Sequence, residues 1–180
     1  MSYTTDLIER IRDSSKWPDF ERPHFLDELA DIANQAFSKD TIEGYLASLL
    51  IYQQLGEELI RLLLKDAQFF IQLSVFPAEM HFIEKQRLTF GQVIDELKAT
   101  ISFEGKTKII SACQELNKHR IEIVHGLTKR TSLVDVASQL RQAKKLYDEI
   151  YELSFQAYDD FRLSFKDFRK DVDWSDYLNE

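Results

Sequence analysis

Apolar residues along most of the chain recur every three or four positions, which is the spacing of an amphipathic α-helix. The first helix is expected to begin after Thr5 and to end near Ser14, before Trp17 and Pro18 interrupt the backbone. A second helix is expected after Pro23. Its apolar positions are Phe25, Leu26, Leu29, Ile32, Ala33 and Phe37.

Two longer segments predict the body of the fold. Residues from about 40 to 74 contain no strong helix breaker and are apolar on most faces, so we expect one central helix with Asp40 as its N-cap. A final helix is expected from a cap at Thr131 or Ser132 to about Asp171. Its aromatic residues repeat at spacings of three and four, which favours a core or a dimer seam over a base-stacking platform. They are Tyr147, Tyr151, Phe155, Tyr158, Phe161, Phe165 and Phe168.

Two helices are expected between these segments. Thr89 and Gln92 have the spacing of a capping box and predict a helix from about 90 to 101. The next helix is expected from about Thr107 to His125, with Gly126 ending it in a left-handed conformation.

The whole pattern predicts an all-α protein, an up-and-down helical bundle in a single domain. Residues 1–38 would form N-terminal helices and residues 40–172 the bundle core. The chain has 180 residues with 5 Gly and 3 Pro, and we find no linker or internal repeat. No window approaches the roughly 18 apolar residues that a membrane span needs, and the N-terminal residues lack the apolar centre of a signal peptide. We therefore expect a cytoplasmic protein with no membrane role, in which the lone Cys113 is a buried hydrophobe.

Charge is distributed unevenly along the chain. The net charge is -8, which argues against indiscriminate nucleic-acid binding. Residues 106–145, however, contain nine Lys and Arg against three acidic residues. Such a segment indicates either a local anion site or a solvated face that acidic neighbours compensate in the fold.

Arg120 and His125 are the most conspicuous chemical features. Arg120 falls in the centre of the apolar stripe of its helix, where a guanidinium needs a carboxylate, a groove or an anion. Glu57 is the preferred carboxylate, although its neighbour Glu58 is an alternative, and a buried pair could serve only to fix the register of two helices. His125 lies in the last turn, where the helix dipole favours the imidazolium. His119 is expected at the helix surface.

The run from Leu116 to Gly126, LNKHRIEIVHG, resembles the Arg-x(4 to 6)-His motif of HEPN domains. These all-helical bundles include metal-independent ribonucleases of toxin–antitoxin, CRISPR and phage-defence systems. The segments TFGQVI and LGEEL are similar in style to bacterial members, and the resemblance covers residues 40–165 in helix order. It departs at Ile121, where many active relatives have a polar residue, often Asn; Asn117 and Glu122 offer polarity nearby.

The resemblance implies an endoribonuclease that uses no metal and no cofactor. His125 would be the general acid or base, and Arg120 would clamp the phosphate and stabilise its transition state. The motif would lie in a cleft between two copies of the chain, with Lys118, Lys129 and Arg130 holding the RNA backbone. An antitoxin protein would be a further partner.

Two other functions stay open at this stage. The chain could be a non-catalytic module that binds RNA, a nucleotide or a protein partner, which Ile121 and the overall acidity favour. Alternatively, the aromatic C-terminal helix could be a surface for dimerisation or for antitoxin binding.

Overall fold

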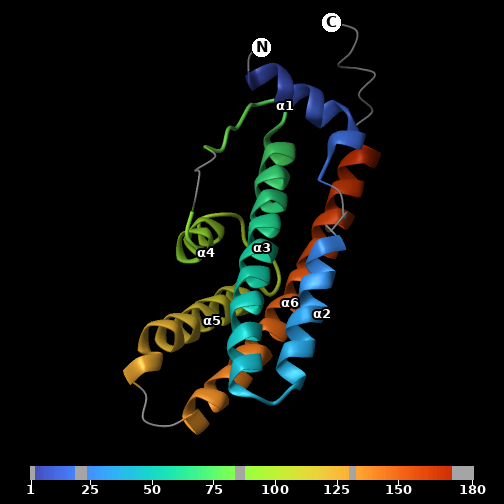
Figure 1. The fold of residues 1–180 in the computed structure, drawn as a ribbon. Helices are drawn as coiled ribbons and strands as arrows, with labels where there is room; N and C mark the ends of the chain where they lie inside the picture. The colour runs from blue at the N-terminus through green and yellow to red at the C-terminus, as the bar shows by residue number, and fades with distance from the viewer. Residues whose placement is uncertain (1–2, 19–23, 84–87, 130–132, 172–180) are drawn as a thin grey trace, which may run out of the picture.

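Two long helices, α3 (Ile42–Val75) and α6 (Leu133–Asp171), lie side by side and form the spine of the molecule (Figure 1). The structure is a computed structural model that describes residues 3–18, 24–83, 88–129 and 133–171. The described residues contain helices and no β-strand, so the all-α prediction is confirmed. The other elements are α1 (Tyr3–Arg12), the short 3-10 helix η1 (Ser14–Lys16), α2 (His24–Ser38), α4 (Phe90–Lys98), α5 (Lys106–Gly126) and the 3-10 helix η2 (Leu127–Lys129).

The long helices alternate in direction. Helix α2 runs antiparallel to α3 on one side, and α5 runs back toward the start of α6 on the other (Figure 1). Helices α3 and α6 therefore run in the same direction. Residues early in α3 contact residues early in α6, and later residues contact later ones. Tyr147 stacks on Tyr52 with ring centroids 4.6 Å apart, and the Tyr158 hydroxyl donates to the carbonyl of Leu59 at 2.6 Å.

The aromatic row of α6 packs in the core, which is the first of the two interpretations that its spacing allowed. Tyr147, Tyr158, Phe161 and Phe165 are buried, and Tyr151 and Phe168 are partly buried against the same core. Phe155 is half-buried and lies 4.7 Å from Tyr151 between ring centroids. Phe70 of α3 lies among the rings at the C-terminal end of the row, 5.8 Å from Phe161 and 5.8 Å from Phe168 between centroids. Aromatic pairs at such distances add about 0.5–1.5 kcal/mol each beyond the burial of their area.

Local capping sets the bounds of the short helix α4. The Thr89 side chain accepts from the Gln92 backbone and the Gln92 side chain accepts from the Thr89 backbone, so the predicted capping box is confirmed. Helix α4 ends at Lys98, three residues before the expected end. The Lys106 ammonium, at the start of α5, donates to the carbonyls of Lys98, Thr100 and Ile101 at 3.0, 2.8 and 2.9 Å. These bonds satisfy carbonyls that a longer helix would have paired.

Two predicted helix boundaries are wrong. Thr41, not Asp40, is the N-cap of α3, because its hydroxyl accepts from the Gly44 backbone. Asp40 has a positive φ of 53°, and its carboxylate accepts hydrogen bonds from the Tyr45 hydroxyl and from Arg141 of α6. Gly126 does not adopt the left-handed conformation, since α5 includes it and continues into η2. The predicted caps Thr131 and Ser132 lie outside the described residues.

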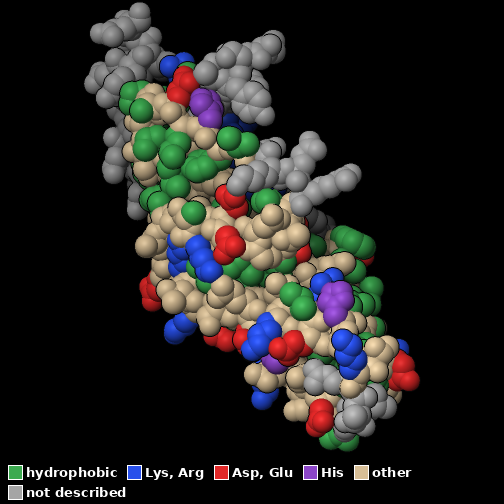
Figure 2. Space-filling view, turned by 90° about the vertical axis from the view of Figure 1, so that its left-hand side faces the viewer, with side chains coloured by type: hydrophobic (Ala, Val, Ile, Leu, Met, Phe, Trp, Pro, Cys, Tyr) green, Lys and Arg blue, Asp and Glu red, His purple; other side chains and the backbone are tan. Residues whose placement is uncertain are grey.

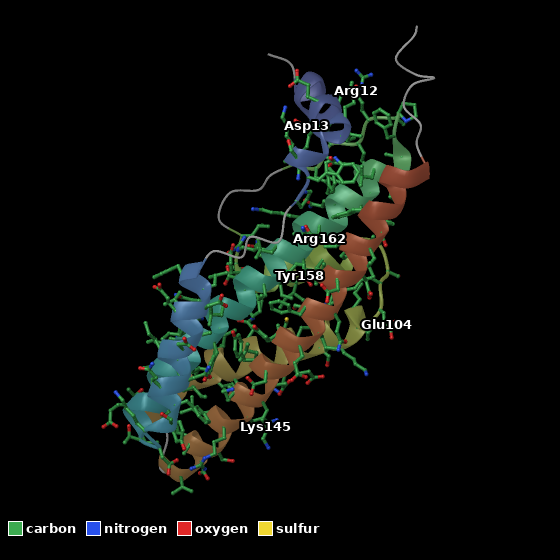
Figure 3. The ribbon with its side chains drawn as sticks, turned by 90° about the vertical axis from the view of Figure 1, so that its right-hand side faces the viewer. Arg12, Asp13, Glu104, Lys145, Tyr158 and Arg162 are labelled. Atoms are coloured by element: carbon green, nitrogen blue, oxygen red, sulfur yellow. The ribbon has the colours of Figure 1, made fainter. Side chains whose placement is uncertain are left out.

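The N-terminal segment is held against the far end of the spine. Trp17 is buried and meets Phe69 and Phe165 edge-on, and its indole nitrogen donates to the Ile11 carbonyl at 3.1 Å. Beside it, Arg162 of α6 donates to the Pro18 carbonyl and to Asp66 of α3, the latter at 3.3 Å (Figure 3). Among the described residues, no helix is both long and apolar enough to cross a bilayer.

Asp66 is only 3% exposed, and this burial dominates its ionisation. Loss of hydration raises the pKa of Asp66 to about 6, although Arg162 and Arg10 both act to lower it. The neutral carboxyl is therefore favoured by folding.

The close approach of α2 and α3 predicts an asymmetric response to two glycine substitutions. A Cβ on Gly44 would lie 2.2 Å from the carbonyl oxygen of Ala36, whereas a Cβ on Gly91 in α4 would meet only the Asn117 amide at 3.9 Å. We expect Gly44→Ala to lower the free energy of unfolding by about 1–3 kcal/mol through overpacking. Gly91→Ala should raise it by up to about 1 kcal/mol through helix propensity. Urea denaturation followed by circular dichroism measures both, and equal effects would contradict the described packing.

The raised pKa of Asp66 predicts a pH-dependent stability difference between the wild type and Asp66→Asn. Protonation of Asp66 stabilises the folded state. This stabilisation is complete below the ordinary pKa of 3.8 and is lost as the pH rises through about 6. The stability of the wild type relative to Asp66→Asn should therefore fall by about 2–3 kcal/mol between pH 4 and pH 7. Urea denaturation across this range measures the difference, with the exposed Asp31→Asn as control. A relative stability that rises with pH would contradict the assignment.

Candidate functional site

The second half of α5 carries most of the predicted site residues, and its packing decides which of them are accessible. Leu116 packs against α3 at Gly56, where a Cβ would lie 3.4 Å from the Leu116 side chain. Beyond this contact α5 diverges from the spine (Figure 1). Figure 2 shows Lys, Arg, acidic and His side chains mixed on the lower part of the face that α5 presents to the viewer.

Arg120 is partly buried and is incompletely paired. Its Nε is shielded from solvent and has no hydrogen-bond partner among the described residues. A buried donor without a partner costs about 1–3 kcal/mol, which a bound acceptor would recover. Arg120 therefore has an unmet hydrogen-bond donor, and its role in binding an anion stays a prediction.

Glu57 does not supply the partner that Arg120 was expected to have. Its carboxylate accepts from Arg61 at 2.5 Å and from Gln53 at 3.2 Å, all three residues being on the same face of α3. Arg61 also donates to the Leu88 carbonyl at 2.5 Å, which ties α3 to the residue before the α4 cap. Glu57 thus belongs to the connection between α3 and α4. The spacing of four residues between Glu57 and Arg61 was the sequence signal for this pair.

A strip of side chains runs along α5 beside Arg120, and it consists of the half-buried Asn117 and the exposed Ile121, Val124 and His125. These positions are spaced four, three and one residues apart, so they share one side of the helix. Ile121 is 44% exposed and Val124 is 42% exposed, while His125 is exposed at the end of the helix. We call these four residues the α5 strip. It presents two large apolar side chains to solvent next to the predicted catalytic histidine.

His119 is buried, so its predicted surface position is wrong. Only 6% of the residue is exposed, and neither ring nitrogen has a hydrogen-bond partner among the described residues. The nearest carboxylate oxygen, that of Glu115, lies 4.0 Å from Nε2. The packed face of α5 contains Leu116, His119 and Ile123, which are three and four residues apart. Compared with the predicted apolar stripe, this face is rotated toward His119 and away from Val124.

The basic segment is partly neutralised by local partners. Lys118 pairs with Glu115 at 3.1 Å, and this hydrogen bond, helped by the charges of Glu115 and Glu122, raises the pKa of Lys118. Arg141 pairs with Asp40, which precedes α3, and Lys144 pairs with Asp148 one turn further along α6. Of the predicted RNA-backbone cations, Lys129 is exposed in η2 directly after α5, and Arg130 lies outside the described residues.

The geometry of one copy does not bring Arg120 and His125 to a common point. Five residues of helix turn the chain by about 140° between them, so the two side chains leave α5 in different directions. Both nevertheless lie in the second half of α5, where His125 belongs to the α5 strip and Arg120 lies beside it. The described residues contain no group of three or more His, Cys, Asp or Glu side chains that could hold a metal ion.

The contrast between His119 and His125 yields a test of the site geometry. Replacing the unpartnered His119 by Leu should raise the free energy of unfolding by about 1 kcal/mol, because an apolar side chain loses no hydration when it is buried. The same change at the exposed His125 should leave stability within about 0.5 kcal/mol of the wild type. Thermal and urea unfolding measure both variants. A large loss of stability for His119→Leu would show that its ring has an essential polar partner.

Comparison with known proteins adds no further assignment. No family model, no curated protein and no solved structure matches the chain. The HEPN resemblance therefore stays a prediction that rests on Arg120, His125 and the sequence around them.

Proposed function

We propose that the chain is a metal-independent endoribonuclease of the HEPN type that acts as a homodimer, in the role of a toxin or defence effector. The observation that carries the proposal is the combination of an incompletely paired Arg120 with an exposed strip that ends in His125. A phosphodiester would satisfy the free donor capacity of Arg120. His125 is accessible to move a proton to or from the RNA.

The chemical roles follow from these two side chains. The 2′-hydroxyl of RNA attacks the adjacent phosphorus while the bond from phosphorus to the 5′-oxygen breaks, which leaves a 2′,3′-cyclic phosphate and a 5′-hydroxyl. One imidazole nitrogen of His125 accepts the proton of the 2′-hydroxyl or supplies a proton to the leaving 5′-oxygen, and water carries the other proton. The planar guanidinium of Arg120 donates to the phosphate oxygens as negative charge builds on them. Lys129 lies just beyond the helix end and can hold the RNA backbone electrostatically.

A second copy of the chain would complete this site. Arg120 and His125 diverge on a single helix, but a twofold axis near the α5 strip would bring Arg120 of one copy toward His125 of the other. The same arrangement would cover Ile121 and Val124, whose exposure costs hydrophobic free energy in the monomer. On this proposal, Ile121 is an interface residue rather than a replacement for a catalytic polar group.

RNA cleavage in the presence of a metal chelator tests the proposal. Arg120→Ala and His125→Ala should each reduce the cleavage rate at least 100-fold, because each removes a group worth about two to four orders of magnitude. Matched controls are Arg12→Ala and His81→Ala, since both residues are exposed and lie outside α5. Gel analysis of mixed cellular RNA measures the products. Full activity in either α5 variant would contradict the proposed roles.

The exposed apolar side chains also favour a second candidate, a non-catalytic module that binds a protein partner through the α5 strip. This function predicts no cleavage of any RNA and no effect of His125→Ala. It also predicts that Ile121→Asp abolishes capture of the partner while Arg120→Ala does not. The same set of variants therefore separates the two candidates.

A further inference from the structure

A small hollow lies at the opposite side of the spine from α2, where residues 101–104 run beside α6 (Figure 3). Its volume is about 140 Å³, which is below the roughly 300–1,000 Å³ of sites for larger ligands. Its aromatic walls are Phe70 of α3, Phe103 in the segment before α5, and Phe161 of α6. A compact ligand is the only kind that this space can enclose.

The three rings are held in fixed relative positions. Phe103 and Phe161 meet edge-on with centroids 5.4 Å apart, and Phe70 is tilted by 57° against Phe161 at 5.8 Å. The Lys106 ammonium lies 6.0 Å from the centroid of Phe103 while it donates to three carbonyls of the preceding turn. Lys106 thus anchors the segment that carries Phe103.

The charged groups of the lining are all acidic. Glu104 and Asp160 are exposed carboxylates at the hollow, and neither forms an ion pair with another described residue. The hydroxyl of Ser164, a further lining residue, donates to the backbone carbonyl of Asp160 at 2.9 Å. Two carboxylates next to aromatic walls create a negative potential, and the net charge of -8 adds to it.

We propose that this hollow binds a small organic ammonium ion. The cation would lie against the faces of the phenylalanine rings, where the ring quadrupole attracts positive charge, and Glu104 and Asp160 would balance that charge. An anion is excluded because no cationic side chain lines the hollow. A protein-bound metal ion usually has at least three carboxylate, histidine or cysteine ligands. The described residues that line the hollow do not supply three such side chains. The site is independent of Arg120 and His125.

Titration of the isotope-labelled full-length chain with tetramethylammonium chloride at constant ionic strength tests the proposal. Backbone amide spectra should show saturable shifts centred on residues 101–104 and 157–164. Tert-butanol, a neutral molecule of similar size, should bind at least tenfold more weakly. A parallel titration with n-butylammonium distinguishes a quaternary from a primary ammonium as the better ligand.

Variants assign the binding to the lining. The double variant Glu104→Gln and Asp160→Asn should weaken tetramethylammonium binding at least tenfold, and Phe103→Leu should weaken it at least threefold at unchanged helix content. The matched control is Asp159→Asn with Glu152→Gln, which removes the same charge from exposed positions of α6 outside the lining. It should bind as the wild type does. Absence of saturable shifts, equal binding of tert-butanol, or equal losses in the two double variants would each overturn the proposal.

Discussion

The aromatic face of α6 packs against α3 along both helices, and the rest of the structure depends on this contact. Tyr52 stacks on Tyr147 near one end, Leu59 accepts from Tyr158 in the middle, and Asp66 binds Arg162 near the other end. Burial of each large apolar side chain contributes about 1.5–3 kcal/mol, so the four buried rings of the row make a large apolar contribution to the core. Residues later in α3 contact residues later in α6, as the parallel orientation of the two helices requires.

Parallel spine helices require the intervening chain to return to its starting end. Helix α4, residues 99–105 and α5 make this return. Helix α5 packs against the spine at Leu116 and keeps His119 and Ile123 buried further along, while Ile121, Val124 and His125 on its other side are exposed. The position of Arg120, the α5 strip and Lys129 at one accessible end of the molecule is thus a consequence of the spine. The turn before α5 also produces the hollow at Phe103, because Lys106 holds residues 98–101 against the start of the helix.

The sequence predicted the helices well because their signals are local. The apolar spacing and the Thr89–Gln92 capping box act within a few residues of each other. Three predictions failed where a competing interaction decided the outcome. Asp40 bonds to Tyr45 and Arg141 instead of capping α3, and Arg61 is a nearer partner for Glu57 than Arg120 is. His119 is buried because packing against neighbouring helices rotates the covered face of α5, which the sequence of one helix does not specify. The HEPN identity, the ribonuclease activity and the homodimer remain predictions.

Disulfide cross-linking through Ile121→Cys tests most directly the central claim that a second copy covers the α5 strip. The native Cys113 does not compete, since it is fully buried and its burial raises the pKa of the thiol. We expect Ile121→Cys to form a covalent dimer within minutes under mild oxidation. The control Val134→Cys should stay monomeric on denaturing gels, although Val134 is 77% exposed on α6. Equal cross-linking of the two variants, or a monomeric Ile121→Cys protein at concentrations where the wild type is active, would contradict the claim.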